Sequence, residues 1–177
     1  FLKKKNKVNA VLRNDGHVAL YTQNENGVIR QNVDYLFSEF VPLPLDKLDR
    51  DKNQIILKYP IEEEVAWEVD DKTTIQMKLG YDRFYNTNLP FKLKNQIVST
   101  DETISIKGKK IKNCIKVSGY GKTSYYPDPT IGNINIEIFS TTWFAKGLGM
   151  VKYKREEKSD SETMGNIIYE KTMLIND

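Results

Sequence analysis

The sequence predicts an all-β, or mainly β, protein built as a single curved antiparallel sheet. Apolar and polar residues alternate in many short runs, which is the period of a half-buried strand. Glycine, proline and asparagine separate these runs at short intervals, so consecutive runs are expected to form a meander of about ten to twelve strands. The chain also contains 10 Tyr, 7 Phe and 2 Trp, a composition typical of pleated surfaces. Such a sheet would curl into a half-barrel or an open barrel, with at most about two short helices.

The N-terminal third is expected to begin with a flexible basic tail, residues 1–7, which carries four lysines. A single β domain is expected to span residues 8–177.

The runs VNAVL, HVALYTQ and VIRQNV predict strands, and NENG at 24–27 predicts a hairpin turn between the last two. Residues 34–40 are expected to form at most about two helical turns. Residues 41–53, with two prolines and clustered charges, predict an irregular connection.

The sequence from residue 55 onward predicts further strands and turns. IILKYP, EEVAWEV and TTIQMKL predict strands and precede an aromatic loop, GYDRFYNTNLP. FKLKNQIVST and ETISI predict two strands divided near Thr100–Asp101, and the second forms a tight hairpin with IKNCIKV. A long loop over residues 119–133 leads to INIEIFSTTWFA, the clearest alternating run. MVKYKRE, a polar loop over residues 157–165 and NIIYEKTMLI predict a final hairpin.

The charge and cysteine content narrow the classes of partner and site. The 27 basic and 24 acidic residues are interspersed and give a formal net charge of +3, so we expect no nucleic-acid partner. Cys114 is the only cysteine, which excludes an intramolecular disulfide and a multi-cysteine metal site. No apolar run of about 18 residues is present, so no helical membrane span is expected. We expect neither a metal nor a cofactor.

One motif has the spacing of a calcium loop but lacks its key residues. Asp49, Asp51 and Asn53 match the first three ligand positions. Gln54 and Pro60 stand where the loop requires the glycine of its sharp turn and its bidentate glutamate. The segment is therefore expected to be a polar connection.

Two further motifs suggest phosphate binding and nucleophilic catalysis. Gly121–Lys122–Thr123 matches the end of a phosphate-binding loop, but Lys116 stands where the first glycine of that motif belongs, so a turn is expected. Cys114 and His17 are the only Cys and His, and they would have to act as nucleophile and base without a third partner. A thiol inside an alternating strand is normally a packed core group.

Adjacent carboxylates are the remaining acid–base candidates. Glu62–Glu64 and Asp70–Asp71 would support a carboxylate-dependent hydrolase if two carboxyl groups converged in one cleft. Three acids before an apolar run more often mark a strand entry whose charge discourages edge pairing. The structural interpretation is the one we favour.

Aromatic side chains are the strongest candidates for a binding surface. The two predicted loops carry six of them: Tyr81, Phe84, Tyr85, Tyr120, Tyr125 and Tyr126. Loop aromatics can anchor a partner protein or stack on a ligand. The alternative is that they cap the open ends of the sheet.

Two segments resemble the sequence pattern of a known protein group. In the segment 102–117, the pattern E-T-V-x-V-x-x-G-x-F-x-N-C-x-x-V is matched by Glu102, Thr103, Gly108, Asn113, Cys114 and Val117. In the segment 141–152, the pattern x-Y-A-x-G-V-G-x-V-K is matched by Trp143, Ala145, Gly147, Gly149, Val151 and Lys152. Lys109–Lys110, Ile111 and Leu148 depart from it. Over residues 55–155 the chain resembles a diffuse group of bacterial secreted proteins and lipoproteins of unknown function.

The resemblance implies a fold and a cellular location. Members of the group look like curved antiparallel sheets or half-barrels, some similar in outline to periplasmic lipoprotein carriers. It implies a place in the cell envelope, periplasmic or extracellular and associated with the outer membrane. A lipidated cysteine would lie upstream of Phe1, with KKKNK as part of the tether, and the chain would associate with a membrane only through this lipid anchor. The shared motifs specify hairpins and glycine turns, so they imply no activity.

The expected function is that of an extracytoplasmic, monomeric, non-enzymatic domain that binds an apolar small molecule, a lipid or an envelope protein. The concave face of the sheet would bind the ligand. Its candidate lining residues, chosen by strand face, are Trp67, Ile75, Met77, Ile136, Ile138 and Trp143. The alternatives are a structural accessory subunit of an envelope assembly and the carboxylate-dependent hydrolase. An interior filled by side chains would exclude the small-ligand version.

Overall fold

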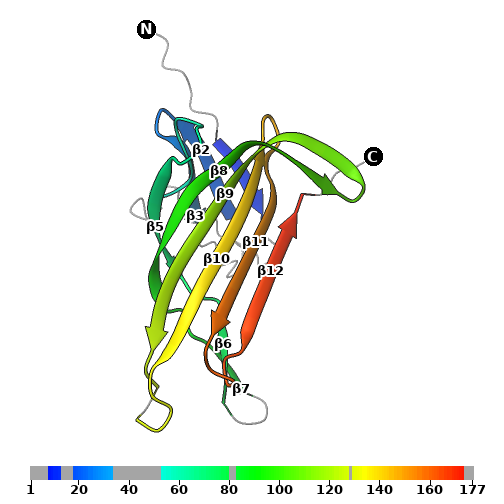
Figure 1. Ribbon diagram of the computed structural model, residues 1–177. Coiled ribbons are helices and arrows are strands. Elements are labelled where there is room, and N and C mark those ends of the chain that lie inside the picture. Colours follow the sequence, from blue (N-terminus) through cyan, green and yellow to red (C-terminus); the bar gives the residue numbers. More distant parts are fainter. Residues whose placement is uncertain (1–7, 13–17, 34–52, 80–82, 128, 174–177) are drawn as a thin grey trace, which may run out of the picture. The chain divides into compact units, whose positions relative to one another are not determined.

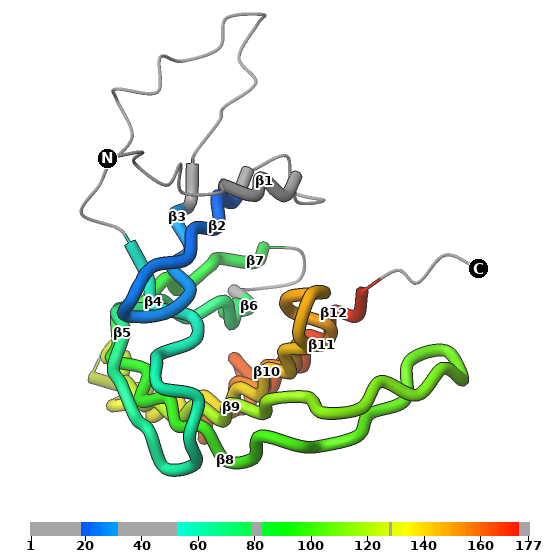
Figure 2. Tube along the Cα trace, turned by 90° about the horizontal axis from the view of Figure 1, so that it is seen from above, coloured from blue at the N-terminus to red at the C-terminus, as the bar shows by residue number. Residues whose placement is uncertain are grey.

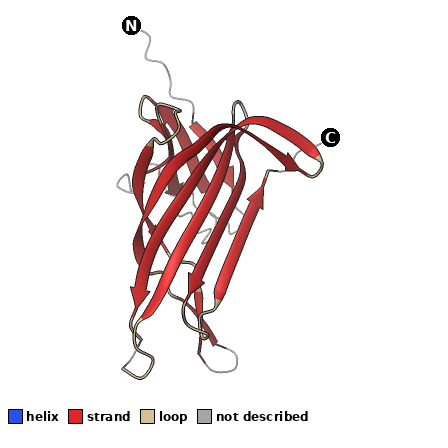
Figure 3. Cartoon of the chain, in the orientation of Figure 1, coloured by secondary structure: helices blue, strands red, loops and turns tan. Residues whose placement is uncertain are grey.

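The computed structural model describes residues 8–12, 18–33, 53–79, 83–127 and 129–173. The regular structure in these ranges is entirely β-strand, and paired strands are antiparallel, so the predicted all-β class is confirmed (Figure 3). The chain divides into two compact units, Phe1–Pro60 and Ile61–Asp177. The expected basic tail and the expected helical turns at 34–40 lie outside the described residues, and the single domain over 8–177 stays a prediction.

The first unit contains a four-stranded sheet in the order β1-β2-β3-β4. Its strands are β1 Val8–Leu12, β2 Val18–Asn24, β3 Gly27–Val33 and β4 Asn53–Lys58. The predicted hairpin is confirmed, because the Asn26 N–H donates to Asn24 Oδ1 at 2.9 Å in the turn between β2 and β3. A Cβ at Gly27, where φ is 142°, would overlap the Leu57 carbonyl oxygen, so this close approach requires glycine.

The second unit contains a six-stranded sheet in the order β12-β11-β10-β9-β8-β5 and a hairpin of β6 and β7 (Figure 1). The strands of this sheet are β5 Ala66–Lys72, β8 Pro90–Ile106, β9 Lys109–Tyr125, β10 Ile134–Ala145, β11 Gly149–Ser159 and β12 Asn166–Thr172. The hairpin strands are β6 Gln76–Leu79 and β7 Arg83–Asn86. The sheet is open, with β5 and β12 at its edges. The described strands thus form three sheets instead of the predicted single one.

β8 and β9 are each 17 residues long and contain bulges, and the sequence predicted a break at one of those on β8. The expected division near Thr100–Asp101 is wrong: Ser99 pairs with Lys116 and Glu102 pairs with Cys114, so β8 holds one extra residue here and continues. A bulge on β9 follows, where Asn113 has φ 54°. Bulges interrupt the period of two without ending the strand, which explains the misplaced boundary.

β9 and β11 also run further than predicted. The loop expected from residue 119 begins only after Tyr125, because β9 stays in register with β10 up to Tyr125 opposite Ile134. The polar loop expected from residue 157 begins after Ser159, because β11 still pairs with β10 at Ile136. The predicted strand INIEIFSTTWFA corresponds residue for residue to β10.

The core of the second unit lies between the six-stranded sheet and β6. The sheet contributes Phe91, Leu93, Ile134, Ile136 and Ile138 on the face that we call the inner face. Ile75, Met77 and Met164 pack against this face and complete the cluster. Gly121 leaves room for a neighbouring ring, because a Cβ at this position would lie 2.5 Å from Phe91 Cδ2.

The far part of the β8–β9 hairpin extends beyond the neighbouring strands of the sheet (Figure 2). β9 pairs with β10 only from Ile115 onward, so residues 109–114 of β9 pair with β8 alone. The hairpin is held at this end by a second apolar cluster, formed by Ile106, Cys114, Ala145 and Val151.

Candidate functional site

The residues predicted to line an apolar ligand site lie mainly in the packed core. Ile75, Met77, Ile136 and Ile138 are at most 5% exposed and contact one another within a single cluster. Trp67 on β5 is also buried, and Trp143 is half-buried and packs against the second apolar cluster. Four of the six predicted lining residues therefore belong to the packed core.

A buried ionic network connects β11 to the segment between β5 and β6. Both Glu157 carboxylate oxygens accept from the Thr74 N–H at 2.9 Å, and Oε2 accepts from the Ile75 N–H at 2.8 Å. Arg155 Nε donates to Glu157 Oε1 at 2.7 Å. Glu157 is fully buried, so these donors, rather than water, satisfy its charge.

Arg155 joins two carboxylates in this network. Its Nη1 donates to Asp71 Oδ2 at 2.7 Å, and its Nη2 donates to the Lys72 carbonyl oxygen at 2.7 Å. Burial alone lowers the pKa of Arg155, but the charges of Asp71 and Glu157 and the contact with Tyr153 raise it by more. The guanidinium thus stays charged and holds the β5–β6 connection on the inner face.

The carboxylates proposed for a hydrolase are not brought together in a cleft. Glu62, Glu63 and Glu64 are exposed before β5. Asp70 is exposed and forms an ion pair with Lys92 at 2.6 Å. Asp71 is engaged by Arg155 at 2.7 Å. None of these positions forms the paired carboxyl arrangement that acid–base catalysis of glycoside hydrolysis requires.

The predicted aromatic binding residues lie mostly on strands rather than in loops. Phe84 and Tyr85 are exposed on β7, and Tyr120 is exposed on β9. Tyr125, at the end of β9, packs against the main core, and Tyr126 is exposed immediately after it. The loop assignment is therefore wrong for the first four, because the pairing of β6 with β7 and of β9 with β10 includes them. Tyr81 lies outside the described residues.

Tyr120 has a partner that the sequence did not single out, Phe139 on β10. The two residues are directly opposite in the strand register, and their ring centroids lie 5.4 Å apart. Tyr120 is 40% exposed and Phe139 is 38% exposed. Both project from the face opposite the core, which we call the outer face. The signal in the sequence was Phe139 itself, an aromatic residue at a polar position of the alternating run INIEIF.

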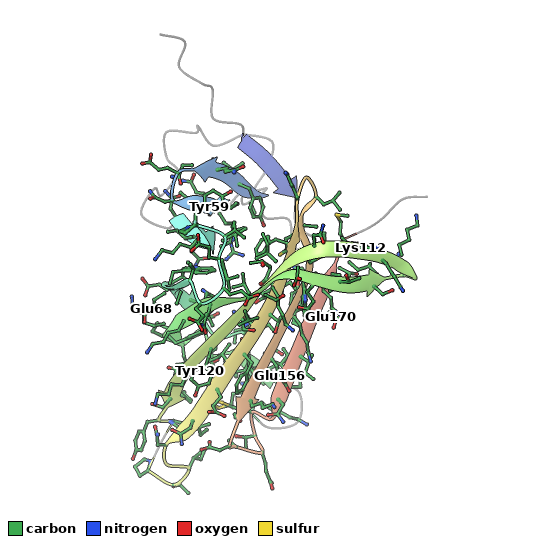
Figure 4. The ribbon with its side chains drawn as sticks, turned by 45° about the horizontal axis from the view of Figure 1, so that its top comes forward. Tyr59, Glu68, Lys112, Tyr120, Glu156 and Glu170 are labelled. Carbon is green, nitrogen blue, oxygen red and sulfur yellow. The ribbon has the colours of Figure 1, made fainter. Side chains whose placement is uncertain are left out.

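Charged groups border the two rings. Lys158 Nζ lies 5.5 Å from the centroid of the Phe139 ring, a cation–π distance. The Tyr120 hydroxyl donates to Glu137 Oε1 at 3.0 Å. This hydrogen bond, with partial desolvation and the charge of Glu137, raises the pKa of Tyr120. We call Tyr120, Phe139 and Lys158 the aromatic patch. The position of Tyr120 on the sheet is labelled in Figure 4.

A depression of about 440 Å³ shares Lys158 with the aromatic patch. It is lined mainly by polar residues of β9, β10, β11 and the position directly after β11: Lys122, Thr123, Asn135, Ile136, Glu137, Lys158, Ser159 and Asp160. Asp160 Oδ1 accepts from the Asn135 N–H and Oδ2 accepts from the Asn135 side-chain amide, both at 2.8 Å. Lys158 thus contributes both to the aromatic patch and to the depression.

The two segments that carry the resemblance meet in the second apolar cluster. Ile106 and Cys114 come from the β8–β9 hairpin, and Ala145 and Val151 come from the ends of β10 and β11. Cys114 is completely buried, and desolvation raises its pKa. The expected packed thiol is confirmed. Asn113, in the left-handed region, forms the bulge that turns Cys114 into the cluster.

Trp143 connects the same segments through polar contacts. Its indole Nε1 donates to Glu102 Oε2 at 3.2 Å. Lys116 Nζ and Lys152 Nζ lie 5.7 Å and 5.5 Å from the centroid of its ring, on the two neighbouring strands. Lys116 also pairs with Glu102 at 3.3 Å. These contacts hold the hairpin against β10, a structural role for the motif residues.

The motifs weighed for metal, phosphate and nucleophile chemistry lie only partly within the described residues. Gly121–Lys122–Thr123 lies within β9, so the predicted turn is wrong. Of the calcium-like motif only Asn53 is described, and His17 lies outside the described residues. Within the described ranges, no group of three or more His, Cys, Asp or Glu side chains gathers where a metal ion could bind. Among the same residues, no helical segment has the length and hydrophobicity of a transmembrane span.

Comparison of the chain with protein-family models, with curated proteins and with solved structures found no match.

Proposed function

We propose that this chain is a non-catalytic binding domain of the bacterial cell envelope and that it binds a protein partner through the outer face of its six-stranded sheet. The single observation that supports the outer face as the binding surface is the aromatic patch. Tyr120 and Phe139 stay exposed on central strands, whereas the apolar residues of the inner face are packed. We favour a protein partner over the expected apolar small molecule, because four of the six candidate lining residues of the small-molecule site are packed in the core.

The aromatic patch has the composition of an interface anchor. Tyrosine and phenylalanine contribute large contact areas while losing few rotamers on binding. Tyr120 is further fixed by its hydrogen bond to Glu137, so little additional ordering is needed when a partner binds. Lys158 lies beside Phe139 and lines the depression. A partner that fits would place an apolar side chain against the two rings and polar groups in the depression.

The proposed location in the cell envelope rests on the resemblance of the two motif segments and on no other observation. In this proposal the domain lies in the periplasm or outside the cell and is anchored through a lipid on a cysteine upstream of Phe1. The half-barrel outline belongs to the same proposal. An accessory subunit of an envelope assembly is one form that partner binding would take. A full-length gene product without a signal peptide and a lipid-acceptor cysteine would contradict the proposed location.

The partner proposal is tested by site-specific cross-linking of the full-length protein in the cells that produce it. A photoreactive benzoylphenylalanine at position 139 is expected to give a discrete cross-linked protein, and Tyr120→Ala in the same chain is expected to reduce its yield. The matched control places the same group at Phe84, which is 61% exposed on β7. No adduct from position 139, or the same adducts from position 84, would contradict the proposal.

A further inference from the structure

The turn of the β8–β9 hairpin carries a concentration of positive charge. Lys107, Lys109, Lys110 and Lys112 lie within six consecutive residues and are all exposed. Lys107 and Gly108 have φ values of 48° and 83°, and Ile106 pairs with Lys109, so the turn contains only two residues. No Asp or Glu occurs between residues 103 and 123. The narrow turn therefore presents its lysines close together.

The turn between β10 and β11 combines a lysine with exposed apolar side chains. Lys146 is exposed, Leu148 is 52% exposed and Met150 is 37% exposed. Gly147 and Gly149 have φ values of 79° and 81°, which allow the chain to reverse around Leu148. No Asp or Glu occurs between residues 138 and 155. Because Leu148 is exposed at this turn, its side chain does not contribute to the packed core.

The two turns lie toward the same end of the second unit, and the β8–β9 turn reaches out past the β10–β11 turn (Figures 1 and 2). Ile106 precedes the first turn, and Ala145 and Val151 flank the second, and all three pack in the second apolar cluster. Lys112 lies on the part of the hairpin that extends past β10 and β11 (Figure 4). We call this surface the basic end: Lys107, Lys109, Lys110, Lys112, Lys146, Leu148 and Met150.

We propose that the basic end docks on a bilayer surface that contains anionic phospholipids. Lysines near such a surface are attracted by its negative potential, and an exposed leucine or methionine gains by entering the interfacial region. The surface is complementary in charge and contains the apolar side chains that a membrane contact uses. The contact is separate from the proposed lipid anchor and from the aromatic patch, so it stands if either of those proposals fails.

The composition of the basic end favours a bilayer over a nucleic acid. All five of its charged residues are lysines, whereas nucleic-acid surfaces use arginine for bidentate phosphate contacts and exposed aromatic rings for stacking. Leu148 and Met150 would remain in water on a purely polyanionic partner, but they would be buried in a lipid interface.

The test is co-sedimentation of the full chain with phosphatidylcholine vesicles that do or do not contain phosphatidylglycerol. Three variants each remove four positive charges. K107Q/K109Q/K110Q/K112Q alters the hairpin turn, K3Q/K4Q/K5Q/K7Q alters the N-terminal lysines, and K72Q/K78Q/K94Q/K122Q alters exposed lysines of the second unit outside the basic end. Circular dichroism checks that each variant is folded.

The wild type is expected to bind phosphatidylglycerol vesicles, and not pure phosphatidylcholine, with an affinity that falls as salt rises. The hairpin variant is expected to lower the partition coefficient by about 100-fold or more, and the two control variants by much less. Leu148→Ser is expected to lower it by about 10-fold without changing the salt dependence.

Three results would overturn the proposal. The first is no binding to the anionic vesicles. The second is that the N-terminal variant loses binding while the hairpin variant keeps it. The third is that soluble polyphosphate displaces the chain and Leu148→Ser binds vesicles as tightly as the wild type, which would make the basic end a polyanion site.

Discussion

Replacing Glu157 with glutamine is expected to destabilise the second unit strongly, although the two side chains have nearly the same shape. The Glu157 carboxylate accepts from two backbone N–H groups, from the Thr74 hydroxyl at 2.9 Å and from Arg155 Nε at 2.7 Å. A glutamine keeps one acceptor oxygen and places an amide donor where these donors converge. It also removes one of the two charges that compensate Arg155, which is buried.

The expected loss in the free energy of unfolding is about 3–5 kcal/mol, the cost of breaking a buried ion pair by removing one partner. For a unit of this size, about 4 °C per kcal/mol gives a fall in melting temperature on the order of 12–20 °C. Urea denaturation followed by circular dichroism measures the free energy, and thermal unfolding measures the temperature.

Glu156→Gln is the matched control, because Glu156 is the next residue on β11 and points to the outer face, where it pairs with Lys158 at 3.2 Å. This change is expected to alter the free energy of unfolding by at most about 0.5 kcal/mol. A loss of less than about 1 kcal/mol for Glu157→Gln, or equal losses for the two variants, would refute the role assigned to the buried network.

Three further predictions concern single residues of the second unit. Gly121→Ala should cost about 1–3 kcal/mol, because its Cβ would lie 2.5 Å from Phe91 Cδ2; Ser124→Ala, at an exposed site on the same strand, should cost little in the same urea titration. Cys114 should react with Ellman's reagent far more slowly in the native chain than in urea, because desolvation both shields the thiol and raises its pKa; equal rates would show that it is not buried. The hydrogen bonds from Asn135 lower the pKa of Asp160 below its usual value of 3.8, so their contribution to stability is present above pH 3.8 and lost as pH falls through the lowered pKa. The melting temperature of the wild type should therefore exceed that of Asp160→Asn at pH 6 by more than it does at pH 2; a constant difference would contradict this linkage.

Alternation within a strand was sufficient to predict several elements, because it depends only on local sequence. β10 is the clearest case, since every second residue from Ile134 to Ile138 is buried. The same pattern could not reveal the bulges of β8 and β9, where an extra residue shifts the exposed face but the chain continues to pair. The strand boundary predicted near Thr100–Asp101 of β8 was consequently wrong.

The role of the inner face depends on contacts between distant residues. Glu157 looked like part of a polar loop, yet Thr74, 83 positions away in the sequence, donates to it in the core. Counting by two from Val151 through Tyr153 and Arg155 would have placed Glu157 on the buried face. Whether an apolar face lines a cavity or a core depends on what covers it, and the position of β6 over β10 could not be predicted from local sequence.

Native mass spectrometry of the purified full chain tests the central claim most directly, namely that the interior is filled and that binding takes place on the outside. The account predicts the mass of the polypeptide without a bound small molecule, and no apolar compound in a solvent extract of the same sample. One equivalent of a retained lipid or other apolar molecule, lost on Ile138→Asp but kept by Phe139→Asp, would contradict it and assign the inner face as the binding site.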